Sequence, residues 1–372
     1  MSVPEKEIIR RIREKGPITF AEFMEVALYW HDGGYYARGE NVWGPEGDYI
    51  TNTDISPVFA RLVARQIGEC WEALGRPDDF GLVEAGAGRG LLSKGVLDFL
   101  KADNPGLFNA VKVWLVEKNP NLRQKESQKA SWHEDMPGVD AGIKGVLLSN
   151  ELIDSFPFHR VVERGGLKEL YVDFDDGRFF FREGNPSTAL LEAYLKRFSI
   201  GLSFGQVAHI NLDATRWVRK AASILSKGFV ITIDYGLPSR ELYAQDRPAT
   251  VQCHFRHRVN NDPFANIGSQ DITTNVDFTA LMAFGGDAGL GLTGFATQKN
   301  FLMGLGIVDE LGGIEEMGVE NSGKLRYNEA VKRLFMPGGV GDVFKVLIQH
   351  KGIEARTALK GFSFKDQSLS LK

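Results

Sequence analysis

The chain has 372 residues, of which 43% are hydrophobic and 25% are charged, and its formal net charge at pH 7 is −4. This is the composition of an ordinary globular protein, and a weakly acidic chain offers no bulk attraction for nucleic acid. The length suits one large domain or two ordinary ones.

Only two cysteines are present, Cys70 and Cys253, and they lie far apart in the sequence. They exclude a disulfide framework and a four-cysteine zinc site, and they fit a reducing compartment. Residues 1–13 mix acids and bases without an apolar core, so they do not resemble a signal peptide and are too acidic for a transit sequence. No apolar run approaches the length of a membrane span. We therefore expect a cytoplasmic protein with no membrane span and no metal.

The first 74 residues predict three helices. Helices at 5–14 and 19–31 are separated by Gly16-Pro17, because proline resists helix continuation. Thr19 is expected to cap the second helix, with Glu22 as its capping-box partner. A polar, glycine-rich stretch at 31–54 follows, and a third helix is expected at 56–74.

From residue 80 onward the pattern alternates between strands and helices, which predicts a parallel sheet covered by helices on both faces. Between residues 80 and 233 the expected strands are 80–84, 111–116, 145–149 and 229–233, and the expected helices are 90–101, 119–130 and 212–226. Residues 160–210 form an insertion with a hairpin signal at Asp176-Gly177 and a helix at 188–198. The remaining elements are a helix at 276–285 and strands at 291–297 and 342–349.

A glycine-rich turn between the first of these strands and its helix carries the strongest functional signal. Gly86, Gly88 and Gly90 alternate along it, and glycines let a backbone turn sharply and approach a ligand closely. Such turns bind nucleotide-like cofactors at the carboxyl edge of open α/β sheets. Leu91 stands where the dinucleotide fingerprint has its third glycine, which favours an adenosyl cofactor over NAD. The alternative is a glycine-rich connection in some other α/β protein.

Two acids end the first two strands. Glu84 would lie beside the glycine turn and attract the cationic end of the cofactor. Glu117 follows Gly90 by 27 residues, near the position where an acid hydrogen-bonds the ribose hydroxyls in doubly wound sheets. The alternative for Glu117 is an acid favoured by the dipole of a following helix, since Asn119-Pro120 could begin one.

Residues 148–157 place an amide and two carboxylates, Asn150, Glu151 and Asp154, after the strand at 145–149. Methyl transfer from a sulfonium is a displacement in which the enzyme mainly positions the nucleophile. A guanidinium nucleophile would need carboxylates to hold it and to favour loss of its proton. Glu151 and Asp154 are the best candidates. The alternative is a helix cap at Asp154 and a solvated acid at Glu151.

Further polar residues follow the later strands. Asp234 and Tyr235 follow the strand at 229–233. Asp234 either orients the substrate or is a buried acid whose hydrogen bonds are made within the protein. His254 and His257, beside Cys253, fall short of a zinc ligand set, so a solvated or substrate-facing loop is the better interpretation.

Together these segments resemble the MidA-type methyltransferases, a family that includes an arginine methyltransferase involved in assembly of mitochondrial complex I. The resemblance spans residues 16–347. It rests on these segments: Phe23-Met24 with Ala27-Leu28-Tyr29, Gly34-Tyr35-Tyr36, Gly47-Asp48-Tyr49-Ile50-Thr51, residues 83–90, 150–157 and 233–236, Gln270-Asp271-Ile272-Thr273, Val276-Asp277-Phe278 and Phe344-Lys345-Val346-Leu347.

The resemblance implies a class I methyltransferase: an α/β, Rossmann-like, mostly parallel sheet with helices on both faces, an N-terminal helical extension and an inserted α+β subdomain. The expected segments are the extension at 1–78, the cofactor-binding half of the core at 79–159, the insertion at 160–210, the rest of the core at 211–350 and a tail at 351–372. The resemblance also implies that the segment after Gly47, with Asp48 and Thr51, helps to form the cofactor and substrate cleft. Asp234, Tyr235, His257 and Asp271 are the substrate-side candidates.

Two segments depart from the family. Residues 51–56 read Thr-Asn-Thr-Asp-Ile-Ser where Thr-Ser-Pro-Glu-Ile-Ser is common, and Asn275 stands where a histidine is common. The second departure concerns the acceptor side and leaves the cofactor side intact.

We therefore expect an S-adenosylmethionine-dependent methyltransferase that modifies a protein arginine, with a role in respiratory complex assembly by family resemblance. The alternatives are a small-molecule methyltransferase and a non-catalytic assembly factor that keeps the cofactor fold. A homodimer could form through Phe179, Phe180 and Phe181, although these residues could equally be core.

Overall fold

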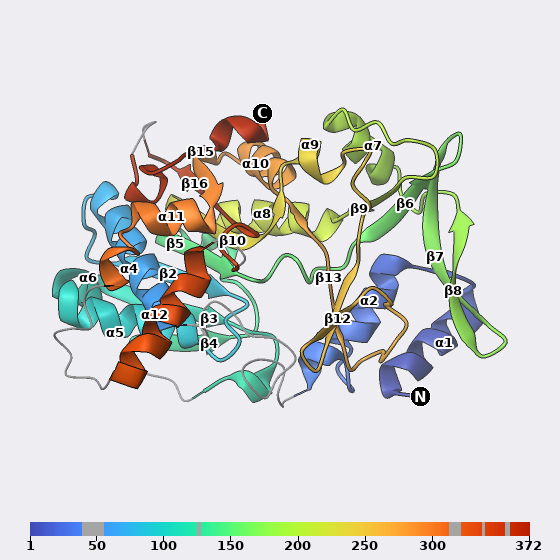
Figure 1. Cartoon of the computed structure of the whole chain (residues 1–372), viewed down its shortest axis with the longest axis horizontal. Coiled ribbons are helices and arrows are strands. Elements are labelled where there is room, and N and C mark those ends of the chain that lie inside the picture. Colours follow the sequence, from blue (N-terminus) through green and yellow to red (C-terminus); the bar gives the residue numbers. More distant parts are fainter. Residues whose placement is uncertain (39–55, 125–127, 312–320, 337–338, 354–357) are drawn as a thin grey trace. The chain divides into compact units, whose positions relative to one another are not determined.

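A computed structural model describes residues 1–38, 56–124, 128–311, 321–336, 339–353 and 358–372 (Figure 1). The chain forms two compact units, each assembled from three segments. Unit 1 contains residues 1–49, 153–216 and 237–280, and unit 2 contains residues 50–152, 217–236 and 281–372. The predicted cofactor residues Asp48 and Thr51 lie outside the described residues.

Unit 2 contains the predicted α/β sheet, in the strand order β15-β16-β10-β5-β2-β3-β4. The pairs β10-β5, β5-β2, β2-β3 and β3-β4 are parallel, whereas β16 is antiparallel to both β10 and β15. The strands are β2 (Phe80–Ala85), β3 (Val111–Val116), β4 (Ala130–His133), β5 (Ile143–Asn150), β10 (Leu225–Leu237), β15 (Gly291–Thr297) and β16 (Phe344–Lys351).

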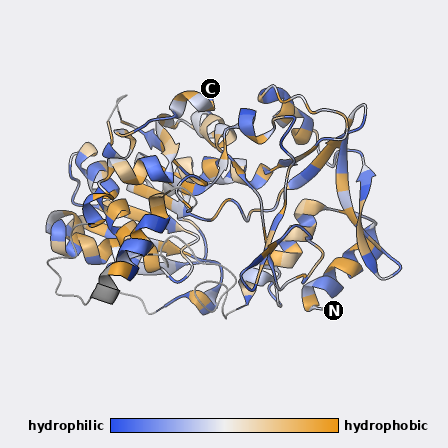
Figure 2. Cartoon of the chain, in the orientation of Figure 1, coloured by the Kyte–Doolittle hydropathy of each residue, from blue (hydrophilic) through white to orange (hydrophobic). Residues whose placement is uncertain are grey.

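Helices cover this sheet with buried apolar residues, and their ribbons carry both hydrophobic and hydrophilic residues (Figure 2). The core of unit 2 joins buried residues of β2, β5 and β10 to those of α4, α5 and α12. The helices are α4 (Pro57–Ala73), α5 (Leu91–Asp103), α6 (Pro105–Ala110), α11 (Gln298–Gly304) and α12 (Asn321–Phe335), with short 3₁₀ turns η2 (Pro120–Leu122), η3 (Val139–Ala141), η4 (Asp309–Leu311), η6 (Lys360–Phe362) and η7 (Ser368–Leu371).

Two further helices cross the boundaries between the units along the chain, α8 (Leu212–Ile224) and α10 (Phe278–Asp287). The predicted helix at 119–130 is wrong. Asn119-Pro120 begins only the 3₁₀ turn η2, and the chain then enters strand β4. Arg123 ends the turn by donating from its guanidinium to the Glu117 carbonyl oxygen, with Nη2 at 2.6 Å.

Unit 1 is built on an antiparallel sheet of order β1-β7-β6-β9, with β8 paired to β7, and on a smaller sheet of order β12-β11-β13. Its elements are α1 (Val3–Lys15), β1 (Ile18–Thr19), α2 (Phe20–Tyr29), η1 (Tyr35–Ala37), β6 (His159–Glu163), β7 (Leu167–Asp175), β8 (Arg178–Gly184), α7 (Leu190–Arg197), β9 (Val207–Ile210), α9 (Ser239–Leu242), β11 (Gln252–Phe255), β12 (Arg258–Asn260), β13 (Asp271–Thr273) and β14 (Val276–Asp277).

The predicted hairpin at Asp176-Gly177 is confirmed, since these two residues join β7 to β8 with φ of 47° and 76°. Positive φ at both central residues is the geometry of a type I′ turn, which matches the twist of the two strands. Phe179 and Phe181 pack against the core of unit 1, whereas Phe180 is 37% exposed. Two of the three phenylalanines proposed for a dimer contact are therefore core residues.

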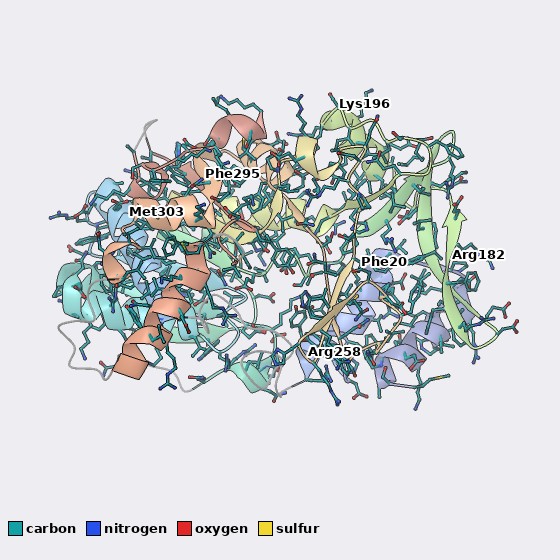
Figure 3. The ribbon with its side chains drawn as sticks, in the orientation of Figure 1. Phe20, Arg182, Lys196, Arg258, Phe295 and Met303 are labelled. Carbon is teal, nitrogen blue, oxygen red and sulfur yellow. The ribbon has the colours of Figure 1, made fainter. Side chains whose placement is uncertain are left out.

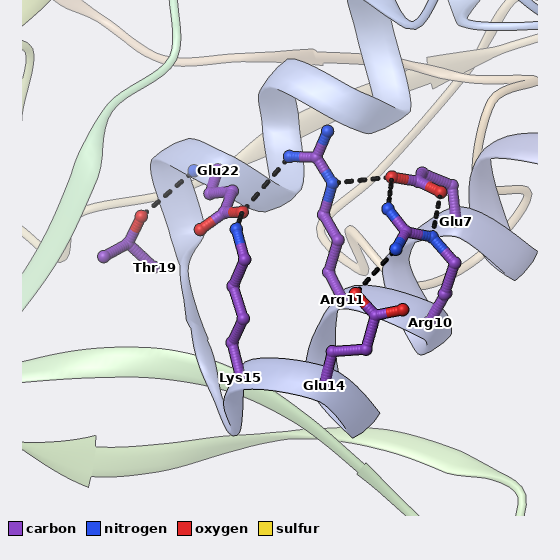
Figure 4. Close-up of polar contacts among 7 residues, drawn as sticks. All are labelled: Glu7, Arg10, Arg11, Glu14, Lys15, Thr19 and Glu22. Atoms are coloured by element: carbon purple, nitrogen blue, oxygen red, sulfur yellow. Dashed lines mark hydrogen bonds and ion pairs between the residues drawn. The ribbon is translucent and has the colours of Figure 1, made fainter.

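The N-terminal helices show one confirmed and one wrong detail (Figure 4). Thr19 caps α2 as predicted, accepting from the Glu22 backbone N–H at 3.1 Å. The Glu22 carboxylate accepts instead from Arg11 Nη1, also at 3.1 Å, which links α2 to α1. A complete capping box occurs at the start of α1, between Ser2 and Glu5.

Candidate cofactor and acceptor sites

The glycine turn follows the fully buried strand β2 and leads into α5. Gly86, Gly88 and Gly90 have φ of 70°, 53° and 70°, values in the left-handed region that favour glycine. The N–H groups of Gly86 and Ala87 both donate to the carbonyl oxygen of Val116 on β3, at 2.9 and 3.0 Å. These two bonds fix the turn to the neighbouring strand.

The three glycines differ in what replaces their missing side chains. A Cβ on Gly86 would lie 2.7 Å from Leu152 Cδ1, and one on Gly90 would lie 3.1 Å from the Trp132 ring. Gly90 is buried, whereas Gly86 is exposed and Gly88 half-buried. The N–H of each glycine already donates to an acceptor in the protein, which for Gly88 is the Glu117 carboxylate. The turn therefore lets the backbone come close to a ligand but offers it no free N–H donor from these glycines.

Glu117 lies directly after β3, and its carboxylate is held at the glycine turn. Oε2 accepts from the Gly88 N–H at 3.0 Å and Oε1 from the Asn119 N–H at 2.8 Å. Burial raises the pKa of Glu117, and these two backbone N–H groups oppose that shift. A carboxylate has about four acceptor positions, so each oxygen keeps capacity for one hydroxyl of a diol.

Glu84 lies near the end of β2 and is only 4% exposed. Its Oε2 accepts from the Ser93 backbone N–H at 3.2 Å and from the Ser93 hydroxyl. Burial raises the pKa of Glu84 to about 7, because desolvation outweighs the two bonds from Ser93. The sequence predicted that Glu84 attracts the cationic end of the cofactor. Its carboxyl is buried within unit 2 and is partly protonated near neutral pH, so only its deprotonated form could attract a cation.

The end of β5 brings together three of the predicted residues. Glu151 has φ of 53°, a left-handed conformation that is unusual for a residue with a side chain, and its N–H donates to the Ile233 carbonyl oxygen at 2.9 Å. The Asn150 Nδ2 donates to Glu151 Oε1 at 3.0 Å. Asp234 is fully buried, and its Oδ2 accepts from the Leu152 N–H at 3.2 Å.

Two polar atoms at this strand end have no hydrogen-bond partner among the described residues. They are the Ser149 hydroxyl oxygen and the Asn150 Oδ1, and both atoms are buried. Buried polar atoms are nearly always hydrogen-bonded, so unpartnered acceptors at the carboxyl edge of a parallel sheet indicate where a ligand's N–H or O–H groups bind. The sequence pattern had selected Asn150 but not Ser149.

Unit 1 holds Asp154 and Asp271, both buried. The Asp154 carbonyl oxygen accepts from the Thr274 N–H at 3.0 Å. The neighbouring Ser155 is bound through its carbonyl oxygen and its hydroxyl to the Tyr29 hydroxyl, at 3.0 Å each.

The Asp271 Oδ1 accepts from the Tyr36 hydroxyl at 2.8 Å, and the rings of Tyr36 and Tyr29 are stacked with centroids 5.4 Å apart. The two tyrosines thus connect the segment of Asp154 to Asp271. This arrangement is held by side chains from distant parts of the sequence, and no local motif predicts it.

The remaining substrate-side candidates lie in different environments. Tyr235 follows Asp234 on β10 and packs edge-on against Phe344 of β16, with ring centroids 5.5 Å apart. His257 is exposed at the tip of the β11-β12 hairpin, with φ of 60°. Cys253 is buried in β11. Across the described residues, no group of three or more His, Cys, Asp or Glu side chains is arranged to hold a metal ion.

Unit 2 combines a strand–glycine turn–helix, an acid at the end of β3, and polar atoms at the end of β5 that have no partner among the described residues. This is the arrangement of α/β proteins that bind nucleoside cofactors. The chain belongs to the family described as "Putative S-adenosyl-L-methionine-dependent methyltransferase", which matches residues 62–296.

Solved structures support the same family. A crystal structure from Burkholderia thailandensis, bound to S-adenosyl-homocysteine, is 30% identical, with a TM-score of 0.87, and covers 99% of this chain and 96% of its own. A native crystal structure from the same organism is 29% identical, with a TM-score of 0.84 and the same coverage.

Two curated relatives are named as arginine methyltransferases. The Homo sapiens protein named "Protein arginine methyltransferase NDUFAF7, mitochondrial" is 26% identical over 391 residues, which cover 94% of this chain and 84% of the relative. Its Drosophila melanogaster homologue is 27% identical over 310 residues, covering 73% of this chain and 68% of the relative.

The family, the fold class and the enzyme class predicted from the sequence are confirmed: the chain is a methyltransferase that uses S-adenosyl-L-methionine. The predicted cytoplasmic location is wrong, because the curated relatives are named as mitochondrial proteins. No helix among the described residues is both long and apolar enough to cross a bilayer.

Proposed function

We propose that this methyltransferase modifies an arginine side chain of a protein. The single observation that carries the proposal is the pair of acceptors at the end of β5: the Glu151 carboxylate and the buried Oδ1 of Asn150, which has no partner among the described residues. A guanidinium presents several N–H donors in a fixed plane and binds best to acceptors grouped in this way. The names of the curated relatives support the same acceptor.

The cofactor-side roles follow from the geometry of unit 2. S-adenosyl-L-methionine supplies an electrophilic methyl group on a sulfonium. Glu117 would hold the ribose hydroxyl pair with the free acceptor positions of its two oxygens. Gly86 and Gly88 would let the backbone approach the methionine part, whereas Gly90 makes room for Trp132.

The acceptor-side role belongs to Asn150 and Glu151. Glu151 would accept a guanidinium N–H and take the proton that the nitrogen loses when it is methylated. Asn150 would accept a second N–H and keep the guanidinium plane oriented. Asp154 stays a candidate from the sequence, and its backbone is fixed through Thr274 in unit 1.

The test is methyl transfer from radiolabelled S-adenosyl-L-methionine to lysate proteins and, separately, to lysate metabolites. We expect label in protein, recovered as methylarginine after acid hydrolysis. Glu151→Gln should abolish transfer while S-adenosyl-homocysteine affinity, measured by isothermal titration, stays unchanged. Label confined to metabolites would instead establish a small-molecule methyltransferase.

A role in assembly of a respiratory complex follows from the family resemblance, and its test is cellular. A strain lacking this gene should recover complex assembly with the wild-type chain and not with Glu151→Gln. Recovery with the Glu151→Gln variant would instead support a non-catalytic assembly factor.

A further inference from the structure

Unit 1 contains a half-buried cation, Arg160, for which the described residues hold no acidic partner. Arg160 lies on β6 directly opposite His209 on β9, so the two side chains share one face of the antiparallel sheet. The Arg160 guanidinium lies over the Phe181 ring at 4.4 Å and over the Phe20 ring at 5.4 Å. Phe20, labelled in Figure 3, begins helix α2.

Arg160 makes no hydrogen bond or ion pair with any described residue, and its Nε is buried without a partner. Glu169 on the neighbouring strand β7 already has other partners, because it binds His159 Nδ1 at 2.7 Å and the Ser187 N–H at 2.6 Å. Burial lowers the pKa of Arg160 to about 10, which still leaves it charged at neutral pH. A half-buried charge that has no counter-charge among the described residues is costly to the fold, so an external anion suits this position.

His209 supplies a second unsatisfied group on the same face. Only 8% of its surface is exposed, its ring stacks on Phe158 with centroids 4.6 Å apart, and its Nδ1 is 2.8 Å from the Thr274 hydroxyl oxygen. Its Nε2 is buried with no partner among the described residues. Burial and the Arg160 charge hold the pKa of His209 well below its ordinary 6.5, so the ring is neutral at pH 7. When the Thr274 hydroxyl donates to Nδ1, the ring proton is on Nε2 and can be donated.

We propose that Arg160 and His209 form an anion subsite that binds the carboxylate of an acidic side chain in the protein substrate. The guanidinium binds carboxylate through paired N–H groups, and the two phenyl rings keep water away and strengthen that bond. The source of the carboxylate rests on the proposed function, whereas the subsite itself does not. The acceptor protein would then carry an aspartate or glutamate that binds unit 1 through this subsite.

The subsite is tested with acetate as the probe, at constant ionic strength in sodium chloride. We expect acetate to shift the side-chain nitrogen signals of Arg160 and His209 in the labelled protein, with saturation. Arg160→Met, which keeps the apolar stem, should weaken acetate binding by about tenfold or more, since it removes the charged donor. Arg164→Met is the matched control, because Arg164 pairs with Glu183 near the surface.

Two results of these titrations would overturn the proposal. No acetate-dependent shift in the wild type, or an equal shift with chloride alone, would refute the subsite. A shift with inorganic phosphate and not with acetate would refute the carboxylate assignment. If Arg160→Met does not fold, Arg160→Lys and His209→Gln take its place, and each should weaken acetate binding while keeping a polar group in position.

The source is tested by competition. A polyglutamate peptide should inhibit methylation of lysate proteins by the wild type, whereas a polyglutamine peptide should not, and Arg160→Met should lose that difference with a raised KM for lysate protein. Its S-adenosyl-homocysteine affinity should equal the wild-type value. A loss of cofactor affinity would assign the anion to the cofactor carboxylate and overturn the proposal. If lysate proteins are not methylated at all, the acetate titration still reports on the subsite.

Discussion

The glycine turn of unit 2 and the Asp154 segment of unit 1 are stabilised in different ways. In the turn, backbone groups bind backbone groups, as when the Gly86 and Ala87 N–H groups donate to one carbonyl oxygen of β3. In the segment at 153–156, the side chains of Tyr29 and Asn211 hold the main chain. The turn should therefore be sensitive to any side chain added to its glycines, and the segment to the loss of single polar atoms.

The largest effect is expected from Gly86→Val. Valine is strained at φ 70°, and its Cβ would lie 2.7 Å from Leu152, so the turn must move. We expect S-adenosyl-homocysteine affinity to fall more than about 100-fold by isothermal titration, because the close approach of backbone to ligand is lost. Gly75→Val has the same backbone strain in open space and should bind normally. Wild-type affinity in Gly86→Val would contradict this account of the turn.

Glu117→Ala should come second. It removes the proposed ribose contact and leaves the Gly88 and Asn119 N–H groups without their acceptor. We expect cofactor affinity to weaken by about 1–3 kcal/mol, the usual loss for a hydrogen bond to a charged group. Asp98→Ala removes an exposed acid from α5 and serves as the control. Equal losses in both variants would remove Glu117 from the site.

Glu84→Gln tests the buried acid next to the turn. The pKa of Glu84 is raised from its ordinary 4.5 to about 7, so the folded state binds the proton more tightly than the unfolded state. The stability from this proton is complete below pH 4.5 and is lost as the pH rises through about 7, on the order of 2 kcal/mol. Urea unfolding at pH 5 and pH 8 should show this loss in the wild type and a smaller one in Glu84→Gln. The same slope in both would mean that another group titrates.

The smallest effect is expected from Tyr29→Phe. Loss of the hydroxyl removes the contacts with Ser155 and should lower the free energy of unfolding by about 1 kcal/mol. If the Asp154 segment serves the acceptor, kcat should fall several-fold with cofactor affinity unchanged. Tyr171→Phe removes a similar bond, to the Asn185 carbonyl oxygen, and should leave kcat unchanged. A matching fall in kcat there would show that the effect is not specific to the segment.

The fold was largely predictable because its signals are local. The apolar runs at 80–84 and 111–116 correspond to β2 and β3, and Asp176-Gly177 specified its own turn. The sequence could not show that β16 runs antiparallel beside β10, because strand pairing joins residues more than 100 positions apart. The predicted helix at 119–130 failed because Asn119-Pro120 starts a 3₁₀ turn as readily as a helix.

The candidate site was predictable only in part, for the same physical reason. Glycine spacing and the acid at 117 report backbone geometry that is set within one strand–turn–helix unit. The unpartnered atoms of Ser149 and Asn150, and the opposition of Arg160 to His209, depend on how separate strands meet. A lone arginine in a strand carries no signal in the sequence that its counter-charge is missing.

The left-handed backbone at Glu151 sets stability and chemistry against each other at one residue. Glycine would adopt φ 53° without strain, whereas glutamate there costs the fold on the order of 1 kcal/mol. A screen for thermostable variants would therefore favour Glu151→Gly. The more stable protein would lack the carboxylate that we propose takes the proton from the methylated guanidinium.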